Sequence, residues 1–158
     1  ERTGELARLE EQIRSRNEQA IRNPPPVAGL TRTETARTFY FDPSFVLDRN
    51  VEDAEGHVLF PAGTRKNPLD VVSMSKHLLF FDAREEVQVA RAKALIERYQ
   101  GKVKPILVGG SYLDLMKRWK TPIFYDQQGI LTKRLGIRQV PAIVSQEGLR
   151  LRIDEIAL

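Results

Sequence analysis

The sequence LGIRQVPAIV at residues 135–144 decides the fold that we expect for this chain. An apolar, helix-like run ends at Gly136, and glycine readily takes the left-handed conformation that closes a helix. Pro141 has no backbone N–H, so it belongs at the first residue of a strand or just before it. The bond before a proline is also the common place for a cis peptide. Residues 142–144 are alanine and β-branched residues, so the stretch predicts a helix, a loop and a strand in this order.

At these residues the chain resembles the thioredoxin superfamily, in which a helix, a Gly-Ile step and a Val-Pro or Ile-Pro pair precede a strand. The resemblance implies that Pro141 is cis and faces the position of the redox cysteines. The sequence has no cysteine, so thiol chemistry is excluded. We place the stretch that corresponds to the cysteines at residues 109–112, after a predicted strand and at the start of a predicted helix.

Strand-like and helix-like segments alternate from residue 77 to residue 158. Apolar runs predict strands at residues 78–81, 106–108 and 122–126, amphipathic segments predict helices at 84–99, 113–119 and 129–135, and a hairpin is predicted at 142–153. We expect Asp82 to cap the first of these helices. The order predicts an α/β domain, a thioredoxin-like mixed sheet flanked by helices that lacks cysteines, at residues 77–158.

The N-terminal part of the chain predicts an extension rather than a second large domain. Residues 1–23 predict a helical extension with a narrow apolar stripe at Leu6, Leu9 and Ile13. Such a stripe is too thin to hold a helix alone, so it packs either on this chain or on a partner. The alternative is a terminal helix that is solvated on all sides, and the sequence fits both interpretations equally well. Prolines at 24–26 end the helix and start a stiff Pro-rich linker at residues 24–37.

Residues 38–76 predict a small β-hairpin unit. Short apolar runs at 39–41, 45–47 and 58–60 are separated by turn-forming residues. The unit is too small to bury much surface alone, so we expect it to pack against the main domain.

Composition favours protein partners over nucleic acid. The 158 residues carry a net charge of +4, but lysine and arginine are interspersed with aspartate and glutamate. No apolar segment is long enough to cross a bilayer. The chain begins on Glu1 without Met, so we expect that an upstream segment was removed. The absence of cysteine fits an exported protein, although cytosolic proteins can also lack cysteine.

Candidate catalytic chemistry is sparse. Residues 109–111 are either an anion-binding nest or a plain helix cap, and we favour the cap because no phosphate-binding signature follows. Ser111 as a nucleophile needs a base, and the sequence has only His57 and His77, predicted in a turn and at a strand start. Two histidines without cysteine also argue against a transition-metal site. We therefore expect no catalytic, metal or cofactor site.

Residues near the proline are the candidate for peptide binding. Arg138, Gln139, Val140 and Pro141 lie at what would be the rim of a thioredoxin-like groove. A rigid backbone there could accept an extended peptide as an added strand. The alternative is that Pro141 only fixes the geometry of the loop.

Taken together, motifs spread along nearly the whole chain resemble the TraW family of type-F conjugative transfer proteins. The motifs are PPPV at 24–27, GLTR at 29–32, TFYFDP at 38–43, PAGT at 61–64, NPL at 67–69, LFFD at 79–82, LVGG at 107–110 and GIRQVPA at 136–142. The resemblance implies a periplasmic assembly factor of a type IV secretion system, needed for pilus assembly and associated with a TrbC-like partner. It supplies no catalytic motif, so we expect a non-enzymatic protein that binds through the Leu6 stripe, the groove, or both. The alternative is a chaperone-like binder of extended pilin or partner peptides in the groove.

Overall fold

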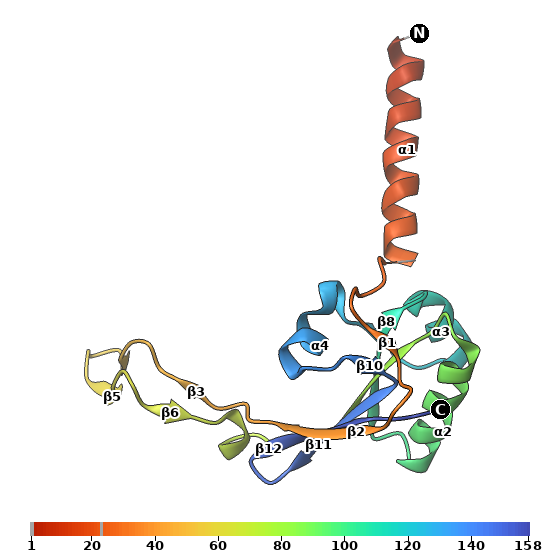
Figure 1. The fold of residues 1–158 in the computed structure, drawn as a ribbon. Helices are drawn as coiled ribbons and strands as arrows, with labels where there is room; N and C mark the ends of the chain where they lie inside the picture. The colour runs from red at the N-terminus through yellow and green to blue at the C-terminus, as the bar shows by residue number, and fades with distance from the viewer. Residues whose placement is uncertain (1, 23) are drawn as a thin grey trace.

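A six-stranded mixed sheet forms the centre of the molecule (Figure 1). The computed structural model describes residues 2–22 and 24–158, with side chains from residue 4 to 14 and from 24 onward. The sheet has the order β2-β12-β11-β7-β8-β9. Its strands are β2 (Arg37–Phe41), β7 (His77–Asp82), β8 (Val103–Gly109), β9 (Phe124–Tyr125), β11 (Ala142–Glu147) and β12 (Arg150–Glu155). Strands β7, β8 and β9 are parallel, and β11, β12 and β2 are antiparallel to their neighbours, so the predicted mixed α/β sheet is confirmed.

Each face of the sheet carries its own hydrophobic core. Helices α2 (Glu86–Arg98) and α3 (Tyr112–Trp119) pack on one face, where they meet Phe81 and its neighbours. Helix α4 (Ile130–Leu135) and the segment around Val27 pack on the other face, which contains Phe80. Because side chains alternate along a strand, adjacent residues Phe80 and Phe81 are both fully buried in opposite cores. This explains why β7 is a continuous apolar run.

Local signals set the ends of the helices. Ser111 caps α3, since its hydroxyl accepts a hydrogen bond from the Asp114 N–H at 3.2 Å. Gly136 follows α4 with a φ of 74°, as the sequence predicts. The prediction that Asp82 caps α2 is wrong. Its carboxylate accepts from the Arg84 N–H in a turn, and α2 begins two residues later at Glu86.

The N-terminal helix and the segment after it are joined to the main body at defined contacts. Helix α1 (Arg2–Arg22) is helical as predicted and projects away from the sheet (Figure 1). The Tyr125 hydroxyl donates to the Pro25 carbonyl at 3.0 Å, and Val27 enters a core. Strand β1 (Thr31–Arg32) then pairs in parallel with β10 (Gln139–Val140). The segment that reads as a linker therefore lies partly against the main body.

Residues 38–76 divide between the main sheet and a projecting arm. Strand β2 pairs with β12 at the edge of the sheet rather than within the small unit. The arm, residues 45–66, consists of two short ladders that extend from the body (Figure 1). They pair β3 (Phe45–Val46) with β6 (Arg65–Lys66) and β4 (Val51–Glu52) with β5 (Val58–Phe60). No arm residue is buried, so the expectation that the unit 38–76 packs against the main domain is wrong for the arm, whereas β2 and Met74 do pack on the main domain. The four-part division of the chain stays a prediction.

Among residues 2–22 and 24–158, no helix combines the length and the apolar character that crossing a membrane requires.

Candidate functional site

The edge beside Pro141 is occupied by the chain itself. The Val140–Pro141 peptide is cis, as the resemblance implies. The Thr31 N–H donates to the Arg138 carbonyl at 3.1 Å, and the Thr33 N–H donates to the Val140 carbonyl at 2.9 Å. The Thr33 hydroxyl also donates to the Pro141 carbonyl at 3.3 Å. These bonds use the backbone groups that we expected to receive an extended peptide.

The four predicted groove residues differ in their exposure. Val140 and Pro141 are buried, and Val140 is only 2% exposed to solvent. Gln139 is half-buried and Arg138 is exposed. The pair Val140 and Pro141 therefore belongs to the packed interior, and only Arg138 presents its side chain freely.

A buried carboxylate holds this loop in place, and sequence reasoning did not find it. Glu155 is 1% exposed and accepts hydrogen bonds from the Arg138 N–H at 2.8 Å and the Gln139 N–H at 3.0 Å. The Arg37 guanidinium donates to both of its oxygens, at 2.8 and 3.0 Å. Burial raises the pKa of Glu155, but the bonds from Arg37, Arg138 and Gln139 outweigh burial and lower the pKa to about 2. Glu155 is thus ionised and joins β2, β12 and the loop.

The loop opposite Val140 is residues 82–85, not residues 109–112. A cavity of about 130 Å³ is lined on one side by Asp82, Arg84 and Glu85, and on the other by Val140 and the segment 30–32. Its polar groups are paired with one another. Arg84 contacts Asp82 at 2.7 Å, and Arg32 contacts Glu85 at 3.5 Å.

Gly109 and Gly110 pack closely against that loop. A Cβ on Gly109 would lie 2.5 Å from an Asp82 carboxylate oxygen, and a Cβ on Gly110 would lie 2.9 Å from the Ala83 Cβ. Close packing against residues 82–84 thus accounts for both glycines. With Ser111 capping α3, the helix-cap interpretation fits this stretch better than an anion nest.

The two imidazoles lie far from Ser111 in the fold. His57 is in the arm, where its Nδ1 lies 3.3 Å from an Asp53 carboxylate oxygen. His77 starts β7 and packs against Tyr99, at the end of the sheet opposite to Gly109. Within the described part of the chain, no group of three His, Cys, Asp or Glu side chains has a geometry for metal binding.

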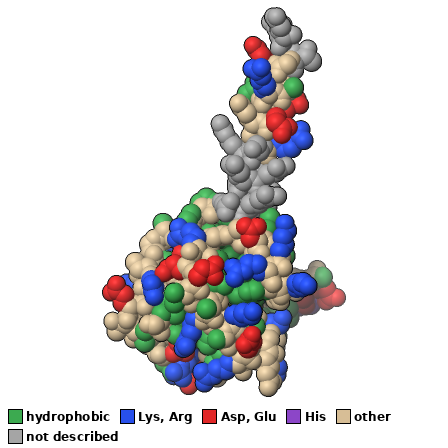
Figure 2. Space-filling view, turned by 90° about the vertical axis from the view of Figure 1, so that its right-hand side faces the viewer, with side chains coloured by type: hydrophobic (Ala, Val, Ile, Leu, Met, Phe, Trp, Pro, Cys, Tyr) green, Lys and Arg blue, Asp and Glu red, His purple; other side chains and the backbone are tan. Residues whose placement is uncertain are grey.

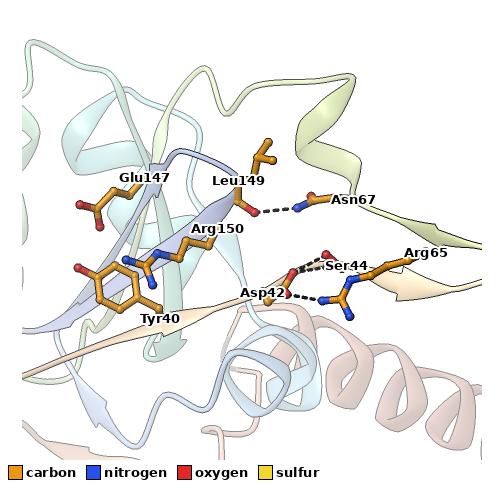
Figure 3. A pocket seen from close by; sticks show the side chains of 8 residues that line it. All are labelled: Tyr40, Asp42, Ser44, Arg65, Asn67, Glu147, Leu149 and Arg150. Atoms are coloured by element: carbon orange, nitrogen blue, oxygen red, sulfur yellow. Dashed lines mark hydrogen bonds and ion pairs between the residues drawn. The ribbon is translucent and has the colours of Figure 1, made fainter.

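An open pocket of about 560 Å³ marks the root of the arm (Figure 3). Its lining residues are Tyr40, Asp42, Ser44, Arg65, Asn67, Glu147, Leu149 and Arg150. Arg65 of the arm contacts Asp42 of the body at 2.6 Å, and the Asn67 amide donates to the Leu149 carbonyl at 2.8 Å. The Ser44 hydroxyl is the main cause that lowers the pKa of Asp42. These contacts join the arm to the sheet, so we interpret the pocket as a joint.

The apolar stripe of α1 is exposed to solvent. Leu6, Leu9 and Ile13 are 59%, 54% and 55% exposed to solvent. Figure 2 shows the described part of α1 standing clear of the body, with hydrophobic, acidic and basic side chains on its surface. In this structure the stripe therefore does not pack on the chain's own globular part.

Comparison with known proteins identifies the family. No family model and no solved structure matches the chain. Protein TraW of Escherichia coli (strain K12) is 38% identical to it over 149 residues, which cover 92% of this chain and 69% of that protein. A match of this identity over nearly the whole chain agrees with the motifs found along the sequence, and we conclude that the chain belongs to the TraW family.

Proposed function

We propose that this protein is a conjugative transfer protein, a non-enzymatic assembly factor of a type-F type IV secretion system that acts in the periplasm during pilus assembly. The observation that carries the proposal is the 38% identity to Protein TraW over 92% of the chain. The exposed α1 stripe supports a role in protein contacts, because exposed apolar side chains in a row at helical spacing favour a partner. A TrbC-like protein is the partner that we propose.

The main domain is best interpreted as a thioredoxin-like framework. Within the sheet, the order β12-β11-β7-β8 joins a parallel pair, β7 and β8, which α2 connects, to the antiparallel hairpin of β11 and β12. Pro141 lies directly before β11, and its neighbour Val140 lines a cavity together with the loop that leads into α2. In such a framework residues 82–85 take the place of the reactive cysteines.

A structural rather than a catalytic role for this loop is supported by its ion pairs. Asp82 is buried and paired with Arg84, and Glu85 lies beside Arg32. The Arg32–Glu85 pair joins the segment 31–33 to the loop, and the Asp82–Arg84 pair lies within the loop, so each carboxylate has a cationic partner.

The chaperone-like alternative has less support. An extended peptide in the groove would have to displace the segment 31–33, which makes three hydrogen bonds to residues 138–141. A titration of the intact chain with unfolded pilin peptides separates the two proposals. General affinity for such peptides would favour the chaperone, and the assembly role predicts none.

A conjugation assay tests the assembly role. A conjugative plasmid that lacks the gene for this protein is complemented with the intact gene, and transfer frequency and pilus number are counted. We expect both to fall to background without complementation and to return with it. Normal piliation in the absence of the protein would overturn the proposal.

A further inference from the structure

A cleft runs between α2 and α3 to the edge of the sheet. Three adjoining cavities of about 360, 230 and 460 Å³ form it. The first two share Lys93, Arg118 and Trp119, and the last two share Ile96 and Thr121, so the three are continuous. We call this surface the α2–α3 cleft.

The floor of the α2–α3 cleft is apolar. Trp119 is half-buried there, and Phe124 of the edge strand β9 is 43% exposed. The apolar lining residues are Val89, Ala90, Ile96, Val103, Pro105, Trp119, Pro122 and Phe124. A hollow of this kind accepts apolar side chains of a protein partner.

The rim of the cleft is positive. Lys76, Lys93 and Lys104 line it, and among residues 4–14 and 24–158 none of them lies within ion-pair distance of a carboxylate. The lining has two carboxylates. Glu86 pairs with an arginine at 3.4 Å, which leaves Glu97 beside three lysines.

The basic character extends over this whole side of the molecule. Residues 86–124 form α2, β8 and α3 with their loops, and they contain eight lysines and arginines but three carboxylates. Their net charge of +5 exceeds the +4 of the whole chain, so the remaining residues together are slightly acidic. Figure 2 views the side on which α2 and α3 lie in Figure 1 and shows lysine and arginine side chains around exposed hydrophobic ones.

The tip of the arm has the opposite chemistry. Residues 48–60 contain four carboxylates and one arginine, a net charge of −3 with histidine neutral. Val51, Val58, Leu59 and Phe60 are 38%, 51%, 56% and 39% exposed. Val51 and Phe60 are paired across the ladder of β4 and β5, so their side chains share one face. The tip is therefore an acidic hairpin with uncovered apolar side chains.

The tip cannot reach the cleft of its own chain. The arm continues from β2, which is one edge of the six-stranded sheet, and the cleft ends at β9, which is the other edge. Figure 1 shows the arm and the helices α2 and α3 on opposite sides of the body. A contact between the two surfaces therefore joins two copies of the chain.

We propose that the arm tip of one copy, residues 48–60, docks in the α2–α3 cleft of a second copy. Its apolar side chains cover the cleft floor and its carboxylates face the lysines of the rim. Two tips would bring like charges together, and so would two clefts, so tip with cleft is the complementary pairing. The contact joins two different surfaces and leaves one of each free, so it continues into a ring or a longer chain of copies.

Two variants that each lack one of the surfaces test the proposal. The first replaces residues 45–66 by a short Gly-Ser turn and keeps the cleft. The second, K76E/K93E, keeps the arm and reverses two exposed charges of the rim. Sedimentation velocity is measured at low salt and at protein concentrations up to about 100 μM, because a contact of this size is weak.

We expect the wild type to form oligomers larger than a dimer as its concentration rises, and each variant alone to stay monomeric. An equal mixture of the two variants should form a heterodimer and nothing larger, because only one arm and one cleft remain. A monomeric wild type would overturn the proposal. Oligomers of K76E/K93E alone would mean that other surfaces pair, and they would overturn it too.

Exchange of charge gives a second test with the arm in place. E52K/E55K, at exposed positions of the tip, should weaken self-association about tenfold or more at low salt, and combining it with K76E/K93E should restore association. The control R134E/R138E changes the net charge as much as K76E/K93E does, at exposed positions in α4 and the loop after it, and should associate as the wild type does. Equal loss with the control would contradict a specific contact at the cleft.

This self-association goes beyond the proposed function and is measured on the purified chain alone. If the wild type stays monomeric, the inference fails and the assembly function stands, because the transfer assay tests that function separately.

Discussion

At the scale of single residues, Glu155 contributes most to the geometry around Pro141. Its buried carboxylate accepts from two successive backbone N–H groups and from Arg37, so one side chain fixes the loop relative to two strands. The sequence carries little signal for it, because Glu155 is one acidic residue in a strand that alternates polar and apolar side chains. Only the pairing of β12 with β2 and the loop brings its partners together.

Replacing this carboxylate should destabilise the fold. For Glu155→Gln we expect the free energy of unfolding to fall by about 2–3 kcal/mol, because the uncharged amide loses charge-assisted bonds and leaves buried donors poorly satisfied. Urea denaturation measures the change. Glu147→Gln, at an exposed position of β11, is the matched control and should change stability by less than about 0.5 kcal/mol. Equal effects of the two substitutions would contradict this role.

The same residue predicts a pH dependence. The pKa of Glu155 is lowered from 4.5 to about 2 in the folded chain, so its contribution to stability is complete above pH 4.5 and is lost as the pH falls towards 2. The stability difference between wild type and Glu155→Gln should therefore shrink over this interval. Urea midpoints of both proteins at a series of pH values check it. A difference that stays constant down to pH 2 would be inconsistent with an ionised Glu155.

At the scale of elements, burial decides which parts the sequence could predict. Strands β7, β8 and β11 are runs of buried apolar residues, and α2 has one apolar face, so pattern alone identifies them. Strand β1 is two exposed residues, Thr31 and Arg32, whose pairing depends on backbone hydrogen bonds that have no side-chain pattern. The sequence therefore predicts only a linker here, and the strand is found in the structure.

The candidate site was predicted only in part, because its placement depends on topology. The sequence identifies Pro141 and the loops that follow two strands. Since β7 and β8 are parallel neighbours, both loops lie at the same edge of the sheet, and the pattern cannot tell which one faces Pro141. In the structure, Val140 beside Pro141 lines a cavity together with Asp82, Arg84 and Glu85, so the loop at residues 82–85 is the one on this side.

The arm should be dispensable for the stability of the main sheet. Its first and last residues, Phe45 and Lys66, are paired across the ladder, so a short Gly-Ser turn can join residues 44 and 67. No arm residue is buried, and the Asp42–Arg65 ion pair is exposed. We expect removal of residues 45–66 to change the free energy of unfolding by less than about 1 kcal/mol.

Urea denaturation followed by the fluorescence of Trp119, which stacks on Phe81 in the core, measures this change. The matched control is Phe81→Ala, which should cost about 3–5 kcal/mol because it leaves a cavity. Unfolding of the chain without its arm would mean that the arm is part of the main fold.

At the scale of the whole molecule, the features that could bind partners lie outside the sheet. The groove beside Pro141 is filled by residues 31–33, and the loop at 82–85 is tied by ion pairs. Helix α1 projects from the body with Leu6, Leu9 and Ile13 exposed (Figure 1). The family fixes the kind of protein, and we propose that it acts through contacts made by α1.

The frequency of conjugative transfer in cells that carry Leu9→Gln in place of the wild-type protein is the most direct test of that claim. Because Leu9 is exposed, the substitution should leave the main domain folded and the protein level unchanged. The account predicts that Leu9→Gln lowers transfer at least about tenfold while Arg8→Gln, on the opposite side of α1, transfers as wild type does. Wild-type transfer with Leu9→Gln at a normal protein level would contradict it.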